Sequence, residues 1–178
     1  MTASKIFTNN PRIRNTVFAW YSFIKNFEIM LTNIAFPPLR KVYFSLRLKK
    51  FNFNSNIDYG FYFRYPRKIY IGKNVDINRN CSFYPSYLLS QGSIYIADRV
   101  IIAPEVKIYC AGQSRLTGSR EDVAGDVKIE EGAYIGANTI IRYGVTIGAG
   151  ATVAAGSVIV KNVPNGKTYG GNPAKEIK

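Results

Sequence analysis

Five consecutive six-residue units, each opening on an aliphatic residue, restrict what this chain can fold into. The run IEEGAY, IGANTI, IRYGVT, IGAGAT, VAAGSV spans residues 129–158 and places its aliphatic residues at positions 129, 135, 141, 147 and 153. Helices repeat every 3.6 residues and strands every two, so neither alone explains a period of six. A coil of three short strands does, because each aliphatic side chain then points inward and stacks on its counterpart in the next coil. The period therefore predicts a mainly β chain that forms a parallel β-helix solenoid.

Shorter runs of the same unit occur earlier. IGKNVD and INRNCS occupy residues 71–82, and IADRVI and IAPEVK occupy residues 96–107. The period is then lost, since 21 residues separate Ile108 from Ile129 where one unit would take six. The excess predicts one extruded loop, residues 109–126. Long loops held on a rigid scaffold usually carry function, and an idle surface insertion is the alternative.

The N-terminal third follows a helical spacing instead. Six apolar residues between positions 17 and 34 recur at intervals of three or four, which places them on one stripe of a helix. They are Val17, Trp20, Ile24, Phe27, Leu31 and Ile34. We expect this stripe to cover the open end of the solenoid, because a solenoid needs a terminal cap. The chain is thus divided into an N-terminal helical, basic-aromatic segment, residues 1–68, and a β-helix domain, residues 69–178.

The net charge of +13 is concentrated in the N-terminal segment. Residues 1–68 contain 12 Lys/Arg and 2 Asp/Glu, whereas residues 69–178 contain 12 and 9. Such a segment attracts anionic lipid, phosphate groups or nucleic acid, and solubility is the simpler alternative. We expect residues 39–68 to make a peripheral contact with an anionic membrane. We expect no nucleic-acid binding, because no recognised nucleic-acid-binding fold accompanies these residues.

The opening residues and the two cysteines are typical of a cytoplasmic protein. The opening MTASKIF lacks the pattern of a secretory signal, and no uninterrupted span of about 20 apolar residues is present. Two cysteines do not make a disulfide framework, and a chain without histidine offers no ordinary zinc site. We therefore expect no metal, and a cytoplasmic location, peripheral at the inner membrane face.

Three stretches resemble the hexapeptide-repeat acyltransferase superfamily, and within it the maltose, galactoside and exopolysaccharide O-acetyltransferases. They are IGKNVDINRNC (71–81), IIAPEVKIYCAG (101–112), and residues 135–178 with the ending VPNGKTYGGNPAK. The resemblance implies a left-handed β-helix, a homotrimer, and acetyl-CoA bound between neighbouring subunits. It further implies that the extruded loop reaches an adjacent subunit and that a sugar of a surface polysaccharide or its precursor accepts the acetyl group. The N-terminal third lies outside the resemblance.

The resemblance also assigns catalytic positions. Gln113 stands where the family has its general-base histidine, Asn78 matches the active-site asparagine, and Asp76 matches an acceptor-site position. Glutamine accepts no proton near neutral pH. Three interpretations follow: a carboxylate such as Asp76, or Glu105, Glu121 or Asp122, serves as the base; the acceptor is an amine that needs only positioning; or the protein is an inactive binding or scaffold trimer.

The same alignment assigns cofactor contacts. Ala137 and Ala155 match small residues of the groove that holds the pantetheine arm, and repeat packing is the alternative reason for them. Lys161 and Lys175 match cations near the CoA phosphates, although the family usually has arginine at the second position. Cys110 has no partner base, so we expect it, like Cys81, to be a small buried residue rather than a nucleophile.

Overall fold

The computed structural model describes residues 11–87, 91–114 and 121–177, and the chain divides into two compact units, residues 1–36 and 37–178. Helix α2 (Pro11–Ile34) belongs to the first unit. Helix α3 (Pro37–Arg47) opens the second unit, and all strands follow it. In the described part of the chain, no helix combines the length and the apolarity needed to cross a bilayer.

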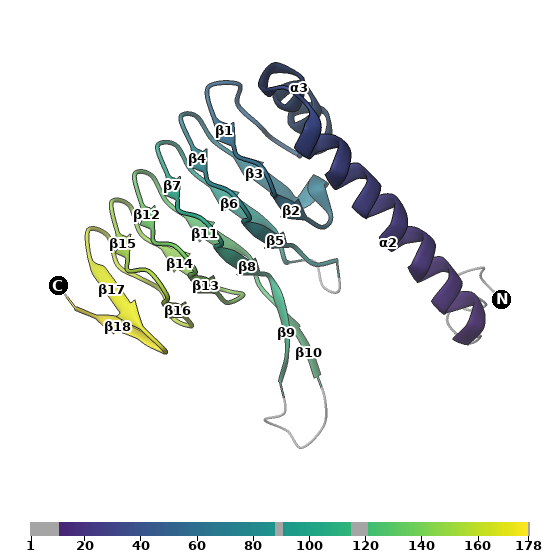
Figure 1. Cartoon of the computed structure of the whole chain (residues 1–178). Helices are drawn as coiled ribbons and strands as arrows, with labels where there is room; N and C mark the ends of the chain where they lie inside the picture. Colours follow the sequence, from purple (N-terminus) through teal and green to yellow (C-terminus); the bar gives the residue numbers. More distant parts are fainter. Residues whose placement is uncertain (1–10, 88–90, 115–120, 178) are drawn as a thin grey trace. The chain divides into compact units, whose positions relative to one another are not determined.

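The strands of the second unit stack coil upon coil into the three faces of a parallel β-helix (Figure 1). Face 1 consists of β1 (Asn56–Ile57), β4 (Asp76–Ile77), β7 (Ile101–Ile102), β12 (Tyr134–Ile135), β15 (Thr152–Val153), β17 (Thr168–Gly171) and the antiparallel β18 (Ala174–Glu176). Face 2 consists of β2 (Tyr62–Phe63), β5 (Ser82–Tyr84), β8 (Lys107–Tyr109), β13 (Ile140–Ile141) and β16 (Val158–Ile159). Face 3 consists of β3 (Ile69–Ile71), β6 (Ile94–Ile96), β11 (Val127–Ile129) and β14 (Thr146–Ile147). The short 3-10 helix η1 (Pro66–Lys68) directly precedes β3.

The period of six has the structural meaning that the sequence predicted. Ile135 of β12 lies in register with Ile102 of the coil before it and Val153 of the coil after it. All three side chains are fully buried. Each aliphatic residue therefore adds one layer to a continuous apolar core, and the mainly β, parallel architecture is confirmed.

The β-helix begins earlier than the predicted boundary at residue 69. Ile57 of β1 pairs with Ile77, and Phe63 of β2 pairs with Phe83, so residues of the predicted N-terminal segment supply two strands of the first coil, which β3 completes. Ile57, Phe63 and Ile69 are in fact six residues apart. The period is less evident here, because an aromatic residue, Phe63, takes the place of an aliphatic one.

Helix α3 supplies the cap that the sequence assigned to the stripe of residues 17–34. Phe44 and Leu48 are buried, and the Phe44 ring lies 5.9 Å from that of Phe61 in the first coil. In α2, by contrast, the side chains of Trp20 and Ile34 remain 63% and 74% exposed. Within the second unit, α3 thus covers the open end, and the cap expected from the stripe of residues 17–34 stays a prediction.

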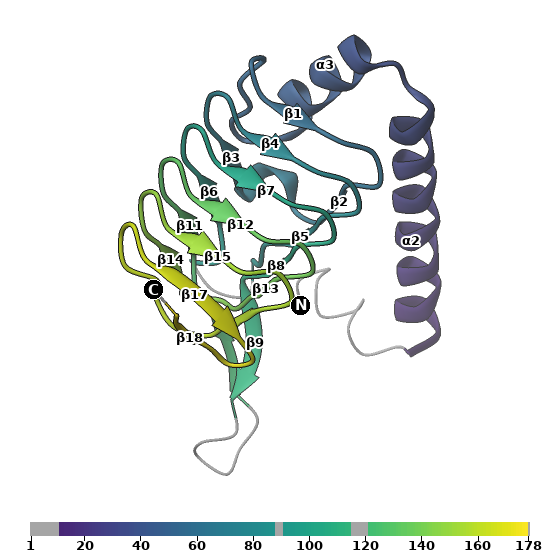
Figure 2. The same cartoon turned by 60° about the vertical axis from the view of Figure 1, so that its left-hand side comes forward.

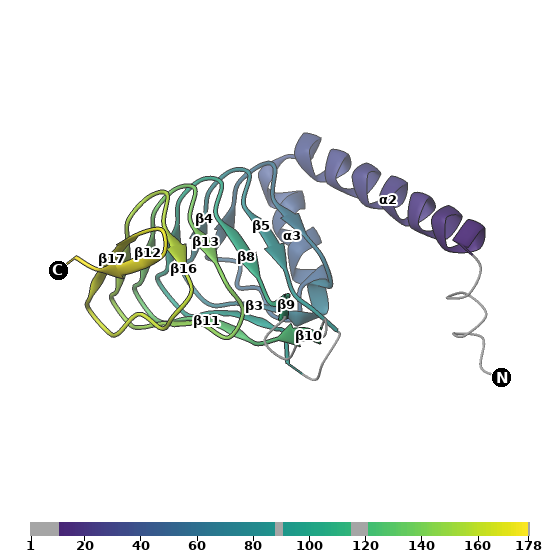
Figure 3. The same ribbon diagram turned by 90° about the horizontal axis from the view of Figure 1, so that it is seen from below.

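The interruption between Ile108 and Ile129 is an ordered arm. Strands β9 (Ala111–Ser114) and β10 (Glu121–Ala124) pair antiparallel and extend away from the β-helix between β8 and β11 (Figures 1 and 2). Figure 3 views this arm nearly end-on. A Cβ atom at Gly112 would lie 2.5 Å from the ring of Tyr143, so the base of the arm packs closely on that ring. The tip, residues 115–120, lies outside the described residues. Where the sequence predicts an extruded loop, the described residues form a two-stranded ribbon.

Candidate active site

A cavity of about 430 Å³ lies where α3 meets the first strands of face 1. Asp76 and Asn78, at β4 and just after it, both line this cavity. Asn56, on the neighbouring strand β1, donates from Nδ2 to Oδ1 of Asp76 at 3.0 Å. Asn78 donates from Nδ2 to the carbonyl oxygen of Ile102 at 2.9 Å, which fixes its side chain at the turn after β4. The structure thus brings together two of the three predicted catalytic residues.

The same cavity contains a buried arginine that sequence reasoning missed. Arg40 of α3 is only 4% exposed, and its Nη2 donates to the carbonyl oxygens of Ile57 at 2.9 Å and Asp58 at 2.8 Å. Its guanidinium lies 4.0 Å from the ring centroid of Tyr59, which also lines the cavity. Burial lowers the pKa of Arg40 from its ordinary value. In the sequence Arg40 is one of several cations in a basic segment, and nothing in the spacing distinguishes it.

Gln113, the third predicted residue, lies on the arm and is not among the residues that line this cavity. Gln113 faces Asp122 across the two-stranded ribbon, and its Nε2 donates to Oδ1 of Asp122 at 3.2 Å. Both side chains are exposed. The arm therefore presents an amide and a carboxylate side by side at the position where the resemblance expects a histidine.

The two cysteines are core residues, as predicted. Cys81 and Cys110 are fully buried and unpaired by disulfides. Burial raises the pKa of the Cys81 thiol to about 11 and that of Cys110 to about 12. Neither thiol is suited to act as a nucleophile or a base near neutral pH, because the thiolate is the reactive form.

Ala137 and Ala155 lie on a ridge formed by the turns that join face 1 to face 2. Residues 78, 103, 136 and 154 occupy equivalent positions in successive coils on this ridge. The backbone amide of each donates to the carbonyl oxygen of an inward-facing residue in the face 1 strand of the next coil. Ala137 and Ala155 each follow one of these positions, and the amide of Gly156 donates to the Ala137 carbonyl oxygen at 2.8 Å. The ridge thus carries Asn78 near one end and both predicted groove alanines towards the other.

The two predicted phosphate-binding lysines are exposed near the C-terminal end of the β-helix. Lys175 of β18 pairs with Gly170 of β17, and Gly170 continues the ridge beyond Ala154. Lys161 follows β16 and therefore lies at the opposite edge of face 2. The structure places Lys175 beside the ridge and Lys161 one face away from it within the same chain.

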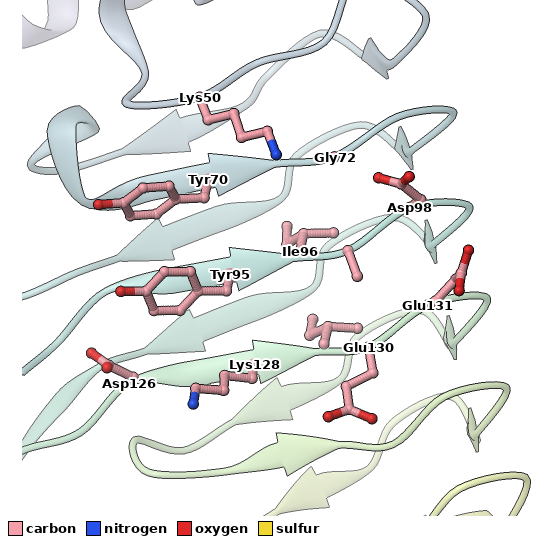
Figure 4. A pocket seen from close by; sticks show the side chains of 12 residues that line it. Lys50, Tyr70, Gly72, Tyr95, Ile96, Asp98, Asp126, Lys128, Glu130 and Glu131 are labelled. Atoms are coloured by element: carbon pink, nitrogen blue, oxygen red, sulfur yellow. The ribbon is translucent and has the colours of Figure 1, made fainter.

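A larger cavity, of about 710 Å³, lies over the outer surface of face 3 (Figure 4). Tyr70 and Tyr95 stack there with ring centroids 4.7 Å apart. Two of its carboxylates serve the backbone: Asp98 accepts from the amide of Lys73 at 2.7 Å, and Asp126 accepts from the amide of Ser93 at 2.8 Å. None of the predicted site residues lines it. In the described residues, no three His, Cys, Asp or Glu side chains form a group that could hold a metal ion.

Comparison with known proteins agrees with this arrangement. The family described as bacterial transferase hexapeptide (six repeats) matches residues 126–161. The galactoside O-acetyltransferase of Escherichia coli is 31% identical over 120 residues, which cover 66% of this chain and 57% of that protein. This chain spans only 55% to 63% of the length of three curated relatives that it matches over 120 residues or more.

Solved structures extend the similarity to most of the chain. A hexapeptide-repeat acetyltransferase from Vibrio cholerae, crystallised with acetyl coenzyme A, superposes with a TM-score of 0.74 at 29% identity, over 84% of this chain and 81% of its own. A maltose O-acetyltransferase from Clostridium difficile gives a TM-score of 0.73 at 29% identity, over the same shares of the two chains. With its six-residue period, its three parallel faces and these matches, the chain belongs to the hexapeptide-repeat transferase family.

Proposed function

We propose that this protein is an acetyl-CoA-dependent acetyltransferase that modifies a sugar in surface-polysaccharide biosynthesis. The observation that carries the proposal is the ridge between faces 1 and 2, where Asn78, Ala137 and Ala155 follow one line along the β-helix. A structural relative of similar fold was crystallised with acetyl coenzyme A. Small side chains at Ala137 and Ala155 leave room for the pantetheine arm, and Lys161 and Lys175 supply positive charge for the CoA phosphates.

In the proposed reaction, the acceptor hydroxyl or amine attacks the thioester carbonyl carbon. A carbon–oxygen or carbon–nitrogen bond forms, the carbon–sulfur bond breaks, and the proton passes to a carboxylate while coenzyme A leaves as its thiolate. Asp76 is the proposed proton acceptor, because it lines the same cavity as Asn78. Gln113 contributes a hydrogen bond to the acceptor rather than a base, because an amide does not take up a proton near neutral pH.

We also propose a homotrimer with left-handed coils. Within one chain, Gln113 lies on the arm and Asp76 lies in the cavity beside α3, and Gln113 does not line that cavity. A site built from both groups is complete only if the arm of one copy reaches the cavity of another. This arrangement explains why the arm extends away from its own β-helix (Figure 2).

The proposed location is the cytoplasm, at the inner face of the membrane, close to lipid-linked sugar precursors. The excess of 12 basic over 2 acidic residues in positions 1–68 supports an anionic surface as the partner. Several aromatic side chains of residues 39–68 cannot lie among headgroups, since Phe44, Phe61 and Phe63 are buried. In this proposal, residues 39–68 contact the anionic membrane through their basic side chains.

A second candidate function follows from the absence of histidine from the whole chain. A trimer without a working base would bind ligands or partners without transferring an acetyl group. Calorimetry with coenzyme A, together with thiol release from acetyl-CoA in the presence of sugars and amino sugars, separates the two functions. We expect binding and turnover with at least one acceptor. Binding without turnover on any acceptor would favour the scaffold, and no binding would refute the transferase.

A further inference from the structure

Helix α2 exposes an unusually large apolar surface. Nine large apolar side chains are between 37% and 74% exposed, and at about 100° per residue they fall within about half of the helix circumference. They are Val17, Trp20, Tyr21, Phe23, Ile24, Phe27, Met30, Leu31 and Ile34. Helices of water-soluble domains direct such a half towards a core.

The other half of α2 is more polar, although Phe18 and Ile29 also fall on it. Ser22, Lys25, Asn26 and Thr32 lie there, and Ser22, Lys25 and Thr32 are less exposed than most of the apolar side chains. Glu28, at the border of the apolar half, is paired with Lys25 at 2.8 Å. The large apolar side chains of α2 are thus among its most exposed side chains.

The fold leaves no need for α2 as a cap. Phe44 of α3 and Leu48, which directly follows the helix, already cover the end of the β-helix. A single helix gains its stability in water mostly from packing of its apolar face. The apolar half of α2 therefore requires a partner outside its own unit.

Charge identifies the kind of partner. The segment that contains α2 carries 12 basic and 2 acidic residues, and both acids are paired: Glu28 with Lys25, and Asp58 with Arg79 at 3.7 Å. An apolar half-cylinder rich in aromatic rings, within a strongly basic segment, is typical of helices that lie in the plane of an anionic membrane. No helix in the described residues is long and apolar enough to cross the bilayer.

We propose that α2 lies in the interface of an anionic lipid bilayer, with its apolar half among the acyl chains and its own basic residues against the headgroups. This deepens, and rests on, the proposed location at the membrane. It moves the apolar part of the contact from residues 39–68 to α2, whose large apolar side chains are exposed. The acetyl-transfer site, which lies wholly in the second unit, is thereby held near lipid-linked acceptors.

Trp20 makes the test direct, because it is the only tryptophan of the chain and lies in the apolar half. The full-length protein is mixed with vesicles of phosphatidylcholine alone or with phosphatidylglycerol added. With anionic vesicles we expect the Trp20 emission to shift to shorter wavelength and to be quenched by lipids that carry a quencher on the acyl chain. Salt should weaken the binding, and neutral vesicles should bind at least tenfold less.

Phe27→Gln and Asn26→Gln form a matched pair on neighbouring positions of opposite halves. We expect Phe27→Gln to weaken vesicle binding at least fivefold and Asn26→Gln to change it less than twofold. Coenzyme A binding in solution should be the same in both variants, so a failure of the proposed transferase would be seen separately. The proposal is overturned if Trp20 is already shielded in water because copies associate through α2, or if both variants bind vesicles like the parent protein.

Discussion

Replacement of Asp76 by asparagine separates the chemistry of the proposed site from its fold. The substitution removes the carboxylate but retains an oxygen that can accept the 3.0 Å hydrogen bond from Asn56. Asp76 is exposed, so the free energy of unfolding should change by no more than about 0.5 kcal/mol. Loss of a general base lowers the rate by roughly 10²–10⁴-fold. At about 1.36 kcal/mol for each factor of ten, the activation barrier rises by about 3–5 kcal/mol.

Thiol release from acetyl-CoA gives kcat and KM, thermal unfolding gives stability, and calorimetry gives the affinity for coenzyme A. We expect kcat to fall at least 100-fold while the unfolding temperature and the coenzyme A affinity stay unchanged. Asn56→Ala is the matched control, because it removes the hydrogen-bond donor and leaves the carboxylate. It should lower kcat less than tenfold.

Asp122→Asn tests the competing carboxylate on the arm, next to Gln113. An unchanged kcat in Asp76→Asn would refute the reasoning. A large loss in Asp122→Asn alone would move the proton acceptor from the cavity to the arm.

Three further predictions concern the ridge, the core and the cofactor. Gly136→Ala should lower the free energy of unfolding by about 1–3 kcal/mol in chemical denaturation, because a Cβ there would lie 2.5 Å from the amide nitrogen of Ala155. Burial raises the pKa of Cys110 to about 12, so its thiol ionises first in the unfolded chain and stability is lost as the pH rises above about 8.5. Between pH 9 and 11, Cys110→Ala should therefore lose less stability than the parent protein, by about 1.4 kcal/mol per pH unit, and equal slopes would contradict this. Lys161→Ala should raise KM for acetyl-CoA several-fold with kcat unchanged, and an unaltered KM would remove Lys161 from the phosphate site.

The sequence predicted the β-helix well because its period is local. The inward position recurs every six residues, so the aliphatic residues at 129, 135 and 141 predict the core without any knowledge of distant contacts. The first coil was missed for the same reason, since Phe63 replaces an aliphatic residue of the period. In α2 the apolar spacing correctly predicted a helix, but helical spacing does not identify what covers the apolar side.

The sequence by itself determined the solenoid core, the position of the extrusion and the absence of any histidine, because each is a property of neighbouring residues or of composition. Only the tertiary structure decided that Asn56, Asp76 and Arg40 share one cavity, since Asn56 and Asp76 are 20 residues apart and meet only when two coils stack in register. It likewise decided that Gln113 faces Asp122, because that contact depends on how β9 pairs with β10. It also decided that α3 covers the first coil, because the contact of Phe44 with Phe61 depends on how the helix packs against that coil.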